Sequence, residues 1–346
     1  MEINVGDNVK IKRGSRPTPL SKYESKIKTI NSIPYPIQSD IDTNSIFLNK
    51  CKKYFRIDLN FKFVPSIKGD LLMTSSCDIG NVVILDFQEA FIDDKFFNLE
   101  VSKQISKSYL KYWLIKNKND ISNLGYGTTI KVLYIEPFKQ YLKTKFLPAL
   151  QTQQAIINII EPFENWNIFY LNKIRLLNSL KHRLGKKLFF SLEFNKFCFI
   201  KNCKGKIQQS KEGTYRYYNC SSNVSFIDNY NEYSNDDDLL IITTRGTITS
   251  HIIPRNTYFY ATNNLMIFKG EGIHCFDYWF KNNKKSIISG TSIPMITKKD
   301  LNFLNFAYDK NIEELLQKIN NLIFFFEKIK NIISIIIKKL IEIYIE

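Results

Sequence analysis

Two long segments of the chain carry apolar residues at alternating steps of three and four, which is typical of α-helices that pack lengthwise against a partner. Each seam of about 32 residues would be roughly 45–50 Å long at 1.5 Å per residue. The polar residues Asn167 and Lys181 interrupt the first seam, where a polar side chain commonly sets the register. The seam in residues 148–189 comprises Ile156, Ile160, Phe163, Asn167, Tyr170, Ile174, Leu177, Lys181, Leu184 and Leu188, and the seam in residues 309–346 comprises Ile312, Leu315, Ile319, Leu322, Phe326, Ile329, Ile333, Ile336, Leu340 and Ile343.

A helix with so broad an apolar face needs a partner, because the exposed face would otherwise promote aggregation. The other helix of the same chain is the simplest partner. A homodimeric coiled coil is the alternative. The pattern of steps does not choose between a parallel and an antiparallel pair.

Residues 1–147 and 190–308 contain short apolar runs broken by Gly, Pro, Asn and Asp, which predicts strands and short helices. These two blocks also repeat each other. Residues 70–76 match residues 238–244 at an offset of 168, residues 112–113 match 278–279 at 166, and residues 127–130 match 290–293 at 163. In this alignment Cys77 corresponds to Arg245. An ordered, slowly drifting offset indicates a diverged duplication and predicts the order domain, helix, domain, helix.

The charge balance predicts a polyanionic partner. The chain has 49 Lys and Arg against 33 Asp and Glu, a formal net charge of +16. Nucleic acid is the usual partner of such a surface, although a Lys-rich composition also occurs in AT-rich genomes. A membrane is disfavoured, because no stretch of 18 apolar residues occurs and residues 309–346, the most apolar block, hold six basic and six acidic side chains.

The motifs of several enzyme classes are absent from the sequence. There is no GxxxxGK[ST], no HExxH and no CxxC, and the three histidines are far apart. The six cysteines form no regular framework, so we expect reduced thiols and no metal site. The first residues alternate and carry charge, unlike a signal peptide, and a cytoplasmic protein is expected. We therefore predict no catalytic residues.

Candidate DNA contacts lie in polar segments that contain glycine or basic residues. Lysines would bind phosphates, while Arg, Gln, hydroxyl and aromatic side chains suit base edges. Turns or strand edges are the structural alternative for each segment. The candidates of the first block are Lys12, Arg13, Ser15, Arg16, Thr18, Ser75, Ser76, Gly127, Thr128, Thr129 and Lys131, and those of the second block are Lys204, Lys206, Gln208, Gln209, Tyr215, Arg216, Tyr217, Arg245, Thr247, Gly290, Thr291 and Ser292.

Several segments resemble the specificity subunits of type I restriction–modification systems. Residues 147–156, with Leu147-Pro148 and Gln151 before an Ile-rich helix, resemble the central conserved region of that family. Residues 33–37 resemble an early segment of its target recognition domains, and residues 238–246, 260–264 and 289–294 resemble the second domain. The entry to the last helix departs from the family pattern, because residues 306–310 replace the usual Pro and Gln.

The resemblance implies an α+β fold: two pseudo-repeated target recognition domains (1–147 and 190–308) separated by two long helices (148–189 and 309–346) that pair as an antiparallel coiled coil. It implies a non-catalytic subunit of a bacterial, cytoplasmic complex. Each domain would read one half of a bipartite, asymmetric target in double-stranded DNA. The helices would dock two modification (methyltransferase) subunits, and restriction (helicase/nuclease) subunits can join. S-adenosylmethionine, ATP and Mg would belong to those partners, and this chain would bind no cofactor.

Two other functions are compatible with parts of the pattern. A basic coiled-coil scaffold would bind nucleic acid without sequence preference, but it would not need matching Tyr, Arg, Gln and Asn loops in both blocks. An enzyme should show a cluster of titratable groups or metal ligands, which the sequence lacks.

Overall fold

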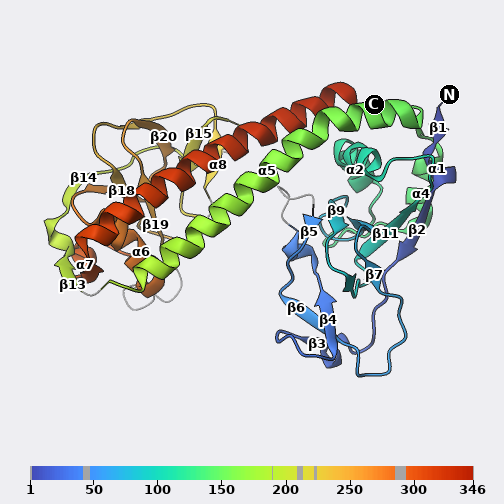
Figure 1. The fold of residues 1–346 in the computed structure, drawn as a ribbon, viewed down its shortest axis with the longest axis horizontal. Helices are drawn as coiled ribbons and strands as arrows, with labels where there is room; N and C mark the ends of the chain where they lie inside the picture. Colours follow the sequence, from blue (N-terminus) through green and yellow to red (C-terminus); the bar gives the residue numbers. More distant parts are fainter. Residues whose placement is uncertain are drawn as a thin grey trace. The chain divides into compact units, whose positions relative to one another are not determined.

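In the computed structural model the chain divides into two compact units, Met1–Asn165 with Ile336–Glu346 (unit 1) and Trp166–Ile335 (unit 2). The structure describes residues 2–41, 47–188, 190–208, 213–221, 224–284 and 294–345. Two long helices, α5 (Leu150–Gly185) and α8 (Lys310–Tyr344), each contribute a segment to both units. They coincide with the two predicted helical blocks to within a few residues at each end (Figure 1).

Unit 1 is built on a five-stranded sheet with the order β2-β11-β8-β9-β5. Its central strand β8 is buried along its whole length, because both faces are covered. Leu71 and Met73 share a core with α2 (Lys107–Lys116), and Leu72 shares a core on the other face with Ala90 and Ile92. Smaller sheets pair β1 with β12, β10 with β7, and β3-β6-β4. The strands are β1 (Ile3–Asn4), β2 (Val9–Arg13), β3 (Glu24–Ser25), β4 (Ser32–Tyr35), β5 (Phe47–Leu48), β6 (Lys53–Arg56), β7 (Ser66–Ile67), β8 (Leu71–Thr74), β9 (Val82–Leu85), β10 (Glu89–Ala90), β11 (Phe96–Val101) and β12 (Phe146–Leu147).

The short helices of unit 1 follow the strands closely. Ser106 caps α2 by accepting from the Tyr109 N–H, so the helix begins directly after the bend that follows β11. The main core joins the sheet to α2, α4, the first turns of α5 and the last turns of α8, including Ile160 and Ile341. The helices are α1 (Val5–Asn8), η1 (Leu20–Lys22), η2 (Gln38–Asp40), α2 (Lys107–Lys116), α3 (Lys118–Asn123) and α4 (Ile135–Lys143).

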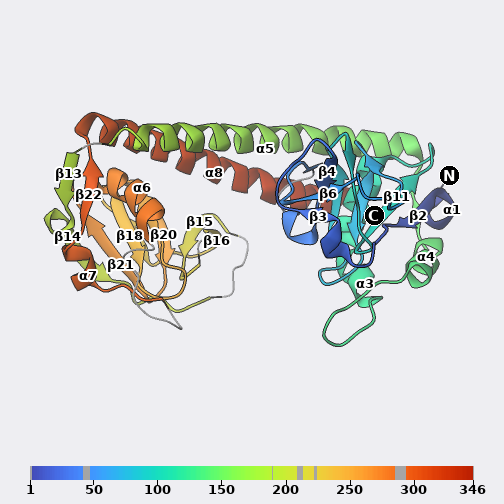
Figure 2. The same ribbon diagram turned by 90° about the horizontal axis from the view of Figure 1, so that it is seen from below.

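Unit 2 has a four-stranded sheet with the order β14-β21-β18-β19, a second sheet β16-β15-β20-β17 and a pair β13-β22 (Figure 2). Here β18 is the fully buried central strand, and its residues are all apolar except Thr243. The strands are β13 (Phe190–Glu193), β14 (Cys198–Asn202), β15 (Tyr215–Tyr218), β16 (Ser225–Ile227), β17 (Glu232–Ser234), β18 (Leu239–Thr243), β19 (Ser250–Ile253), β20 (Thr257–Ala261), β21 (Leu265–Lys269) and β22 (Asn305–Tyr308).

Helix α6 (Ile273–Asn283) packs on the β18–β21 sheet of unit 2, and short helices η3 (Phe194–Lys196) and α7 (Lys298–Asn302) complete the fold. Aromatic side chains fill this core, with Phe276 touching the rings of Phe194, Phe280 and Phe306. At the end of α5, Gly185 lies against Tyr278 of α6: a Cβ there would be 2.1 Å from the ring. A side chain at position 185 would clash with this ring unless the ring moved.

The predicted helical seams are only partly covered within the units. Ile160, Ile174, Ile319 and Ile333 are buried, and most other members are half-buried. Leu322, however, is 45% exposed, so this member of the predicted seam faces away from the packed face. The buried residues Ile157, Leu316 and Ile341 stand next to predicted positions. The covered face rotates along the helices because an α-helix has 3.6 residues per turn rather than 3.5.

Candidate nucleic-acid interface

Several candidate residues of unit 1 lie at or beside the turn that joins β8 to β9. The Ser75 N–H donates to the Lys95 carbonyl at 2.8 Å, and the Ser75 carbonyl accepts from the Leu133 N–H at 2.7 Å. The Cys77 N–H donates to the Lys131 carbonyl at 2.9 Å. The turn therefore holds the segment before β11 on one side and the segment after α3 on the other, although these segments are far apart in the sequence.

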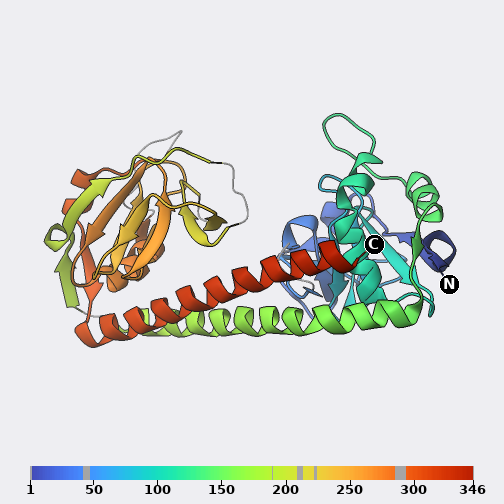
Figure 3. The ribbon, with the colours of Figure 1, turned by 90° about the horizontal axis from the view of Figure 1, so that it is seen from above.

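The loop with Gly127, Thr128, Thr129 and Lys131 is exposed and stands out from unit 1 beyond α3 (Figures 2 and 3). An isolated bridge between Tyr126 and Val132 closes the loop at its base. Backbone pairing thus presents the loop residues to solvent beside the β8–β9 turn.

Ser75 and Ser76 require a correction as candidate contacts, because both are buried. The Ser75 hydroxyl donates to the Asp94 carbonyl at 3.3 Å, and the Gln38 amide donates to the Ser76 carbonyl at 2.6 Å and hydroxyl at 3.2 Å. Their small side chains fill a tight corner and support the turn. The sequence did not single out Gln38, which covers Ser76.

An open pocket of about 750 Å³ adjoins this corner and is lined by Arg16, Thr18, Gln38, Lys53 and Lys95, among others. Arg16 lies 3.7 Å from the Asp94 carboxylate. Lys53 is paired with Glu24 at 2.6 Å, so part of the positive charge is compensated.

Other candidates of unit 1 are anchored at the end of β2. Arg13 donates from Nε to the Asp94 carbonyl at 2.9 Å, and Lys12 forms an ion pair with Glu100 on β11. The Ser15 N–H donates to the Ile92 carbonyl at 3.1 Å. These bonds fix the backbone, while the Lys12, Arg13 and Thr18 side chains remain exposed.

A buried layer supports this surface from below. The Tyr35 hydroxyl donates to Asp93 at 2.7 Å, and the Asp93 carboxylate also accepts from the Lys95 N–H at 3.1 Å. Burial raises the pKa of Asp93, and these two hydrogen bonds oppose the rise. The family-like segment at residues 33–37 thus holds residues 93–95 against the β8–β9 turn.

Unit 2 has an equivalent turn between β18 and β19. The Thr244 N–H donates to the Asn264 carbonyl at 2.8 Å, and the Thr244 carbonyl accepts from the Ile296 N–H at 3.1 Å. The Gly246 N–H donates to the Pro294 carbonyl at 3.2 Å. Each of these hydrogen bonds has a counterpart in unit 1. Residue numbers differ by 169 between the two turns, and by 163 between residues 131–133 and 294–296.

This hydrogen-bond register corrects the sequence alignment of the two turns. Thr74 corresponds to Thr243, and each hydroxyl donates to a carbonyl four residues later. Ser76 therefore corresponds to Arg245, while Cys77 corresponds to Gly246 and shares its positive φ, 58° against 77°. The sequence match of residues 70–76 to 238–244 is therefore displaced by one residue. Asp70 and Asp238, which that match pairs, bind different partners and are not equivalent.

Basic residues of unit 2 converge on the same edge. The Asn263 N–H donates to the Gly205 carbonyl at 2.7 Å, which holds the exposed Lys204 and Lys206 beside the segment that binds Thr244. The Thr247 N–H donates to the Cys220 carbonyl at 3.1 Å. Arg245 and Thr247 are exposed at the tip. Gln209, Gly290, Thr291 and Ser292 lie outside the described residues.

The β15 candidates also require correction. Arg216 is buried, forms an ion pair with Glu327 of α8, and lies 3.9 Å from the centre of the Phe324 ring. The Tyr217 hydroxyl is buried and accepts from the Gln208 N–H at 3.0 Å. Both residues support structure: alternation along β15 points them to opposite faces of the sheet, and both faces are covered. Gln208 is half-buried and donates to the Tyr260 hydroxyl at 2.9 Å.

Tyr215 belongs to an aromatic cluster that the sequence pattern did not reveal. Its ring centre lies 5.0 Å from that of Tyr230, and Tyr258 lies 4.5 Å from Tyr230 and 4.4 Å from Tyr233. Tyr230, Tyr233 and Tyr258 are exposed. Since they come from β20 and β17 or the adjoining loop, only the sheet pairing brings them together.

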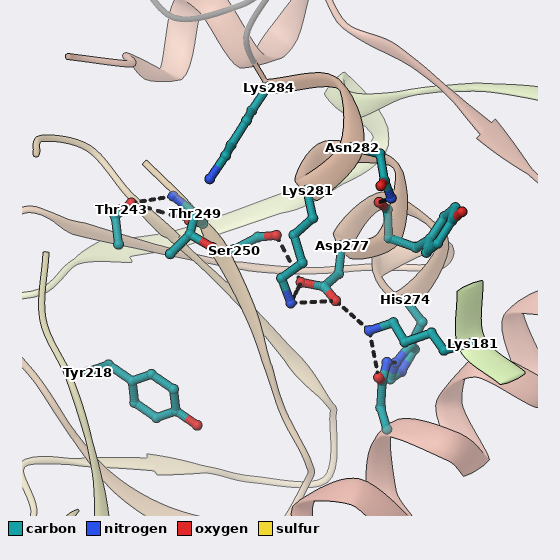
Figure 4. Close-up of polar contacts among 12 residues, drawn as sticks. Lys181, Tyr218, Thr243, Thr249, Ser250, His274, Asp277, Lys281, Asn282 and Lys284 are labelled. Atoms are coloured by element: carbon teal, nitrogen blue, oxygen red, sulfur yellow. Dashed lines mark hydrogen bonds and ion pairs between the residues drawn. The ribbon is translucent and has the colours of Figure 1, made fainter. Parts of the chain in front are cut away.

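A buried polar network joins the long helices to the sheet of unit 2 (Figure 4). Asp277 of α6 accepts from Lys181 of α5 and from Ser250 of β19, each at 2.8 Å, and Lys181 also donates to Asn320 of α8 at 2.8 Å. Burial acts to raise the pKa of Asp277, but the charges of Lys181 and Lys281 outweigh it and hold the pKa well below its ordinary value. The polar seam residue Lys181 thus positions both long helices relative to the sheet.

A second set of contacts surrounds His274 of α6. Its Nε2 lies 3.1 Å from Asp238, and Asn320 donates to its Nδ1 at 2.8 Å. Gln317 of α8 also donates to Asp238 at 2.9 Å. Burial acts to raise the pKa of Asp238, but the hydrogen bonds from His274, Gln317 and the Arg255 N–H lower it to about 2.

The entry of each long helix binds the N-terminus of a short helix in the same unit. Gln153 of α5 accepts from the Ser106 N–H of unit 1 at 2.8 Å, and Glu313 of α8 accepts from the His274 and Cys275 N–H groups of unit 2 at 3.0 and 2.7 Å. A carboxylate suits this position, because the first N–H groups of a helix carry partial positive charge. The atypical entry of the second helix therefore keeps the contact with a different side chain.

In the described residues, no group of three or more His, Cys, Asp or Glu side chains could hold a metal ion. Nor does any helix in that part of the chain combine the length and apolarity that crossing a membrane requires.

The structure gives a chain of two compact units that each expose basic side chains, and comparisons with known proteins give its family. A family model described as "Type I restriction modification DNA specificity domain" matches residues 2–182, more than half of the chain. The chain belongs to this family of DNA sequence-specificity subunits. A search of curated proteins found no match.

Solved structures match along the full length of this chain. The S subunit of a type I restriction-modification system from M. genitalium is 15% identical, with a TM-score of 0.60 over 100% of this chain and 96% of that chain. The HsdS subunit of Thermoanaerobacter tengcongensis is 11% identical, with a TM-score of 0.37 over 100% of this chain and 96% of that chain. The first of these supports a mixed helix and strand fold of the S-subunit type along the whole chain.

Proposed function

We propose that this chain is the non-catalytic, DNA-reading subunit of a type I restriction–modification complex, with units 1 and 2 each reading one half of a split target. The observation that carries the proposal is the pair of turns between β8 and β9 and between β18 and β19. Both are fixed by the same backbone hydrogen bonds, but they present different side chains. A duplicated framework with different tips suits two half-targets of different sequence.

The two units are pseudo-repeats in this proposal. The sheet orders β2-β11-β8-β9 and β14-β21-β18-β19 correspond strand for strand, and each is followed by a helix, α2 or α6, that packs on it. The domains retain the predicted limits 1–147 and 190–308, with the helices at 148–189 and 309–346 as spacer.

The helices α5 and α8 pair antiparallel in this proposal. Within unit 2, Lys181 contacts Asn320 and the Tyr170 ring lies 5.5 Å from that of Phe326, so numbers fall along α8 as they rise along α5. Within unit 1, Ile157 of α5 shares a core with Ile341 of α8 and with Ile345, which directly follows α8. The predicted seam provides the apolar part of this pairing and Lys181 its polar register.

The partners in this proposal are double-stranded DNA, two modification subunits and, where present, restriction subunits, in the bacterial cytoplasm. The α5 segment of unit 2 exposes Trp166, Phe169, Leu176 and Leu180, which recur at helical spacing and suit a protein partner. S-adenosylmethionine, ATP and Mg would be bound by those partners.

Genome-wide adenine methylation in the source organism, with and without this gene, tests the proposal. We expect deletion to remove methylation from one split motif, two short half-sites around a fixed gap, and the intact gene to restore it. Unchanged methylation in a strain that expresses the protein would contradict the proposal. Binding to all sequences with equal affinity would instead favour a non-specific scaffold.

A further inference from the structure

We propose that Arg245 reads a guanine in the half-target contacted by unit 2, and that this contact makes the two half-targets unequal. This inference rests on the proposed function and assigns one base contact within it. Arg245 stands at the tip of the 243–247 turn, between β18 and β19.

The backbone around Arg245 is held on both sides. Residue 245 forms an antiparallel bridge with Met295, and the Thr244 and Gly246 N–H groups donate to Asn264 and Pro294. Inside the turn, the buried Thr243 hydroxyl donates to the Thr247 carbonyl at 2.9 Å and accepts from the Thr249 N–H at 2.7 Å. Such a turn presents its tip side chain with little loss of backbone entropy on binding.

The Arg245 side chain is exposed and has no hydrogen-bond or ion-pair partner within the described part of the chain. Arginine is scarce here, with eight residues against 41 lysines. Arg13, Arg16, Arg56 and Arg216 already contact a carbonyl or carboxylate group. An unpaired guanidinium fork on a rigid turn suits the two acceptors O6 and N7 that guanine shows in the major groove.

Two basic side chains near Arg245 are placed to contact the phosphates of the same half-target. Lys204 and Lys206 are exposed on the loop that binds Asn263, and the adjacent Asn264 accepts from the Arg245 turn. Lysines here can contact phosphates, which position the turn without reading sequence. Arg245 is therefore the specific contact among non-specific ones.

Unit 1 lacks this contact on an equivalent backbone. Ser76 takes the place of Arg245, is 7% exposed, and is covered by the Gln38 amide. A buried serine cannot reach a base edge as arginine does. The same framework would thus read guanine in one half-target only.

Selection of randomised DNA duplexes by the full-length chain tests the inference. We would compare the wild type with R245Q, R245K and the control R183Q, which removes an exposed arginine of unit 2 from α5. R245Q should lose preference for one guanine in one half-site by roughly 10- to 100-fold. R245K keeps the charge but not the fork, so it should lose that preference while retaining overall affinity. R183Q should keep the wild-type motif.

The outcomes separate this inference from the proposed function. A wild-type split motif that R245Q and R245K leave unchanged would overturn the guanine contact and leave the proposed function intact. Equal weakening of all sequences by R245Q would also overturn it, because a phosphate contact behaves in that way. A wild type without any split motif would overturn the proposed function itself. Thermal unfolding of each variant shows whether it folds. If R245Q does not fold, the comparison of R245K with the wild type still tests the inference.

Discussion

Lys181 of α5 and Asp277 of α6 form a buried ion pair of 2.8 Å, with side-chain exposures of 12% and 1%. Replacing Asp277 with Asn would leave the Lys181 charge uncompensated in this environment. We expect D277N to lower the free energy of unfolding by roughly 3–5 kcal/mol, measured by denaturant titration. D236N, which changes an exposed carboxylate of the same unit, should change it by about 0.5 kcal/mol or less. A D277N loss as small as that of D236N would contradict the role of the pair.

Unit 1 contains a comparable pair between Lys111 of α2 and Glu164 of α5, at 2.8 Å. Burial lowers the pKa of Lys111, while Glu164 acts in the opposite direction. We expect E164Q to destabilise the protein by about 3 kcal/mol, because Lys111 would remain buried and charged. K111M/E164Q should recover much of this loss, since methionine fills the space without a charge. A double-mutant cycle with no coupling would show that the two side chains act independently.

The stability of unit 2 should depend on pH through Asp238. Its pKa is about 2 in the fold, because the hydrogen bonds that it accepts outweigh its burial, against an ordinary value near 3.9 in the unfolded chain. The depressed pKa contributes stability above about pH 4, and this is lost as pH falls toward 2. We expect the wild type to lose roughly 2 kcal/mol more than D238N between pH 5 and pH 2. Parallel pH profiles for the two proteins would exclude this contribution.

Exposed lysines at the unit 2 interface should contribute affinity without specificity. We expect K204Q and K206Q to weaken binding to all DNA sequences alike, and each to reduce the slope of log affinity against log salt by about 1. K318Q, on an exposed position of α8, is the matched control and should leave the slope unchanged. Fluorescence anisotropy over a range of salt concentrations measures the slope. An altered base preference in K206Q would assign that lysine a reading role instead.

Much of the local structure is predictable because it depends on short-range patterns. The 3–4 spacing of apolar residues predicted α5 and α8 nearly to their ends, and Lys181 was recognised as a polar position on the seam. The pattern did not identify its partner, because Asp277 lies 96 residues away in the sequence. Lys111 inside an apolar helix was a similar signal of a buried ion pair that sequence analysis alone left unused.

Whether a polar residue faces solvent or the core was less predictable. Arg216 and Arg245 both stand in polar, aromatic or hydroxyl-rich segments of unit 2, but one pairs with Glu327 and the other is exposed. Side-chain direction along a strand changes with every residue, so an error of one residue in register reverses the result. The same sensitivity explains why the sequence alignment paired Arg245 with Cys77, whereas the hydrogen-bond register pairs it with Ser76.

The sequence by itself determined the two long helices, the basic character and the family, because hydrophobic periodicity, charge and ordered motifs are properties of the chain. The tertiary structure decided which segments share an interface. Backbone hydrogen bonds bring residues 75–77 to 131–133, and 244–246 to 294–296, across long stretches of sequence. It also decided that Ser76 is buried while Arg245 is exposed, because a side chain's surroundings depend on strand register and on neighbours such as Gln38 that no local pattern reveals.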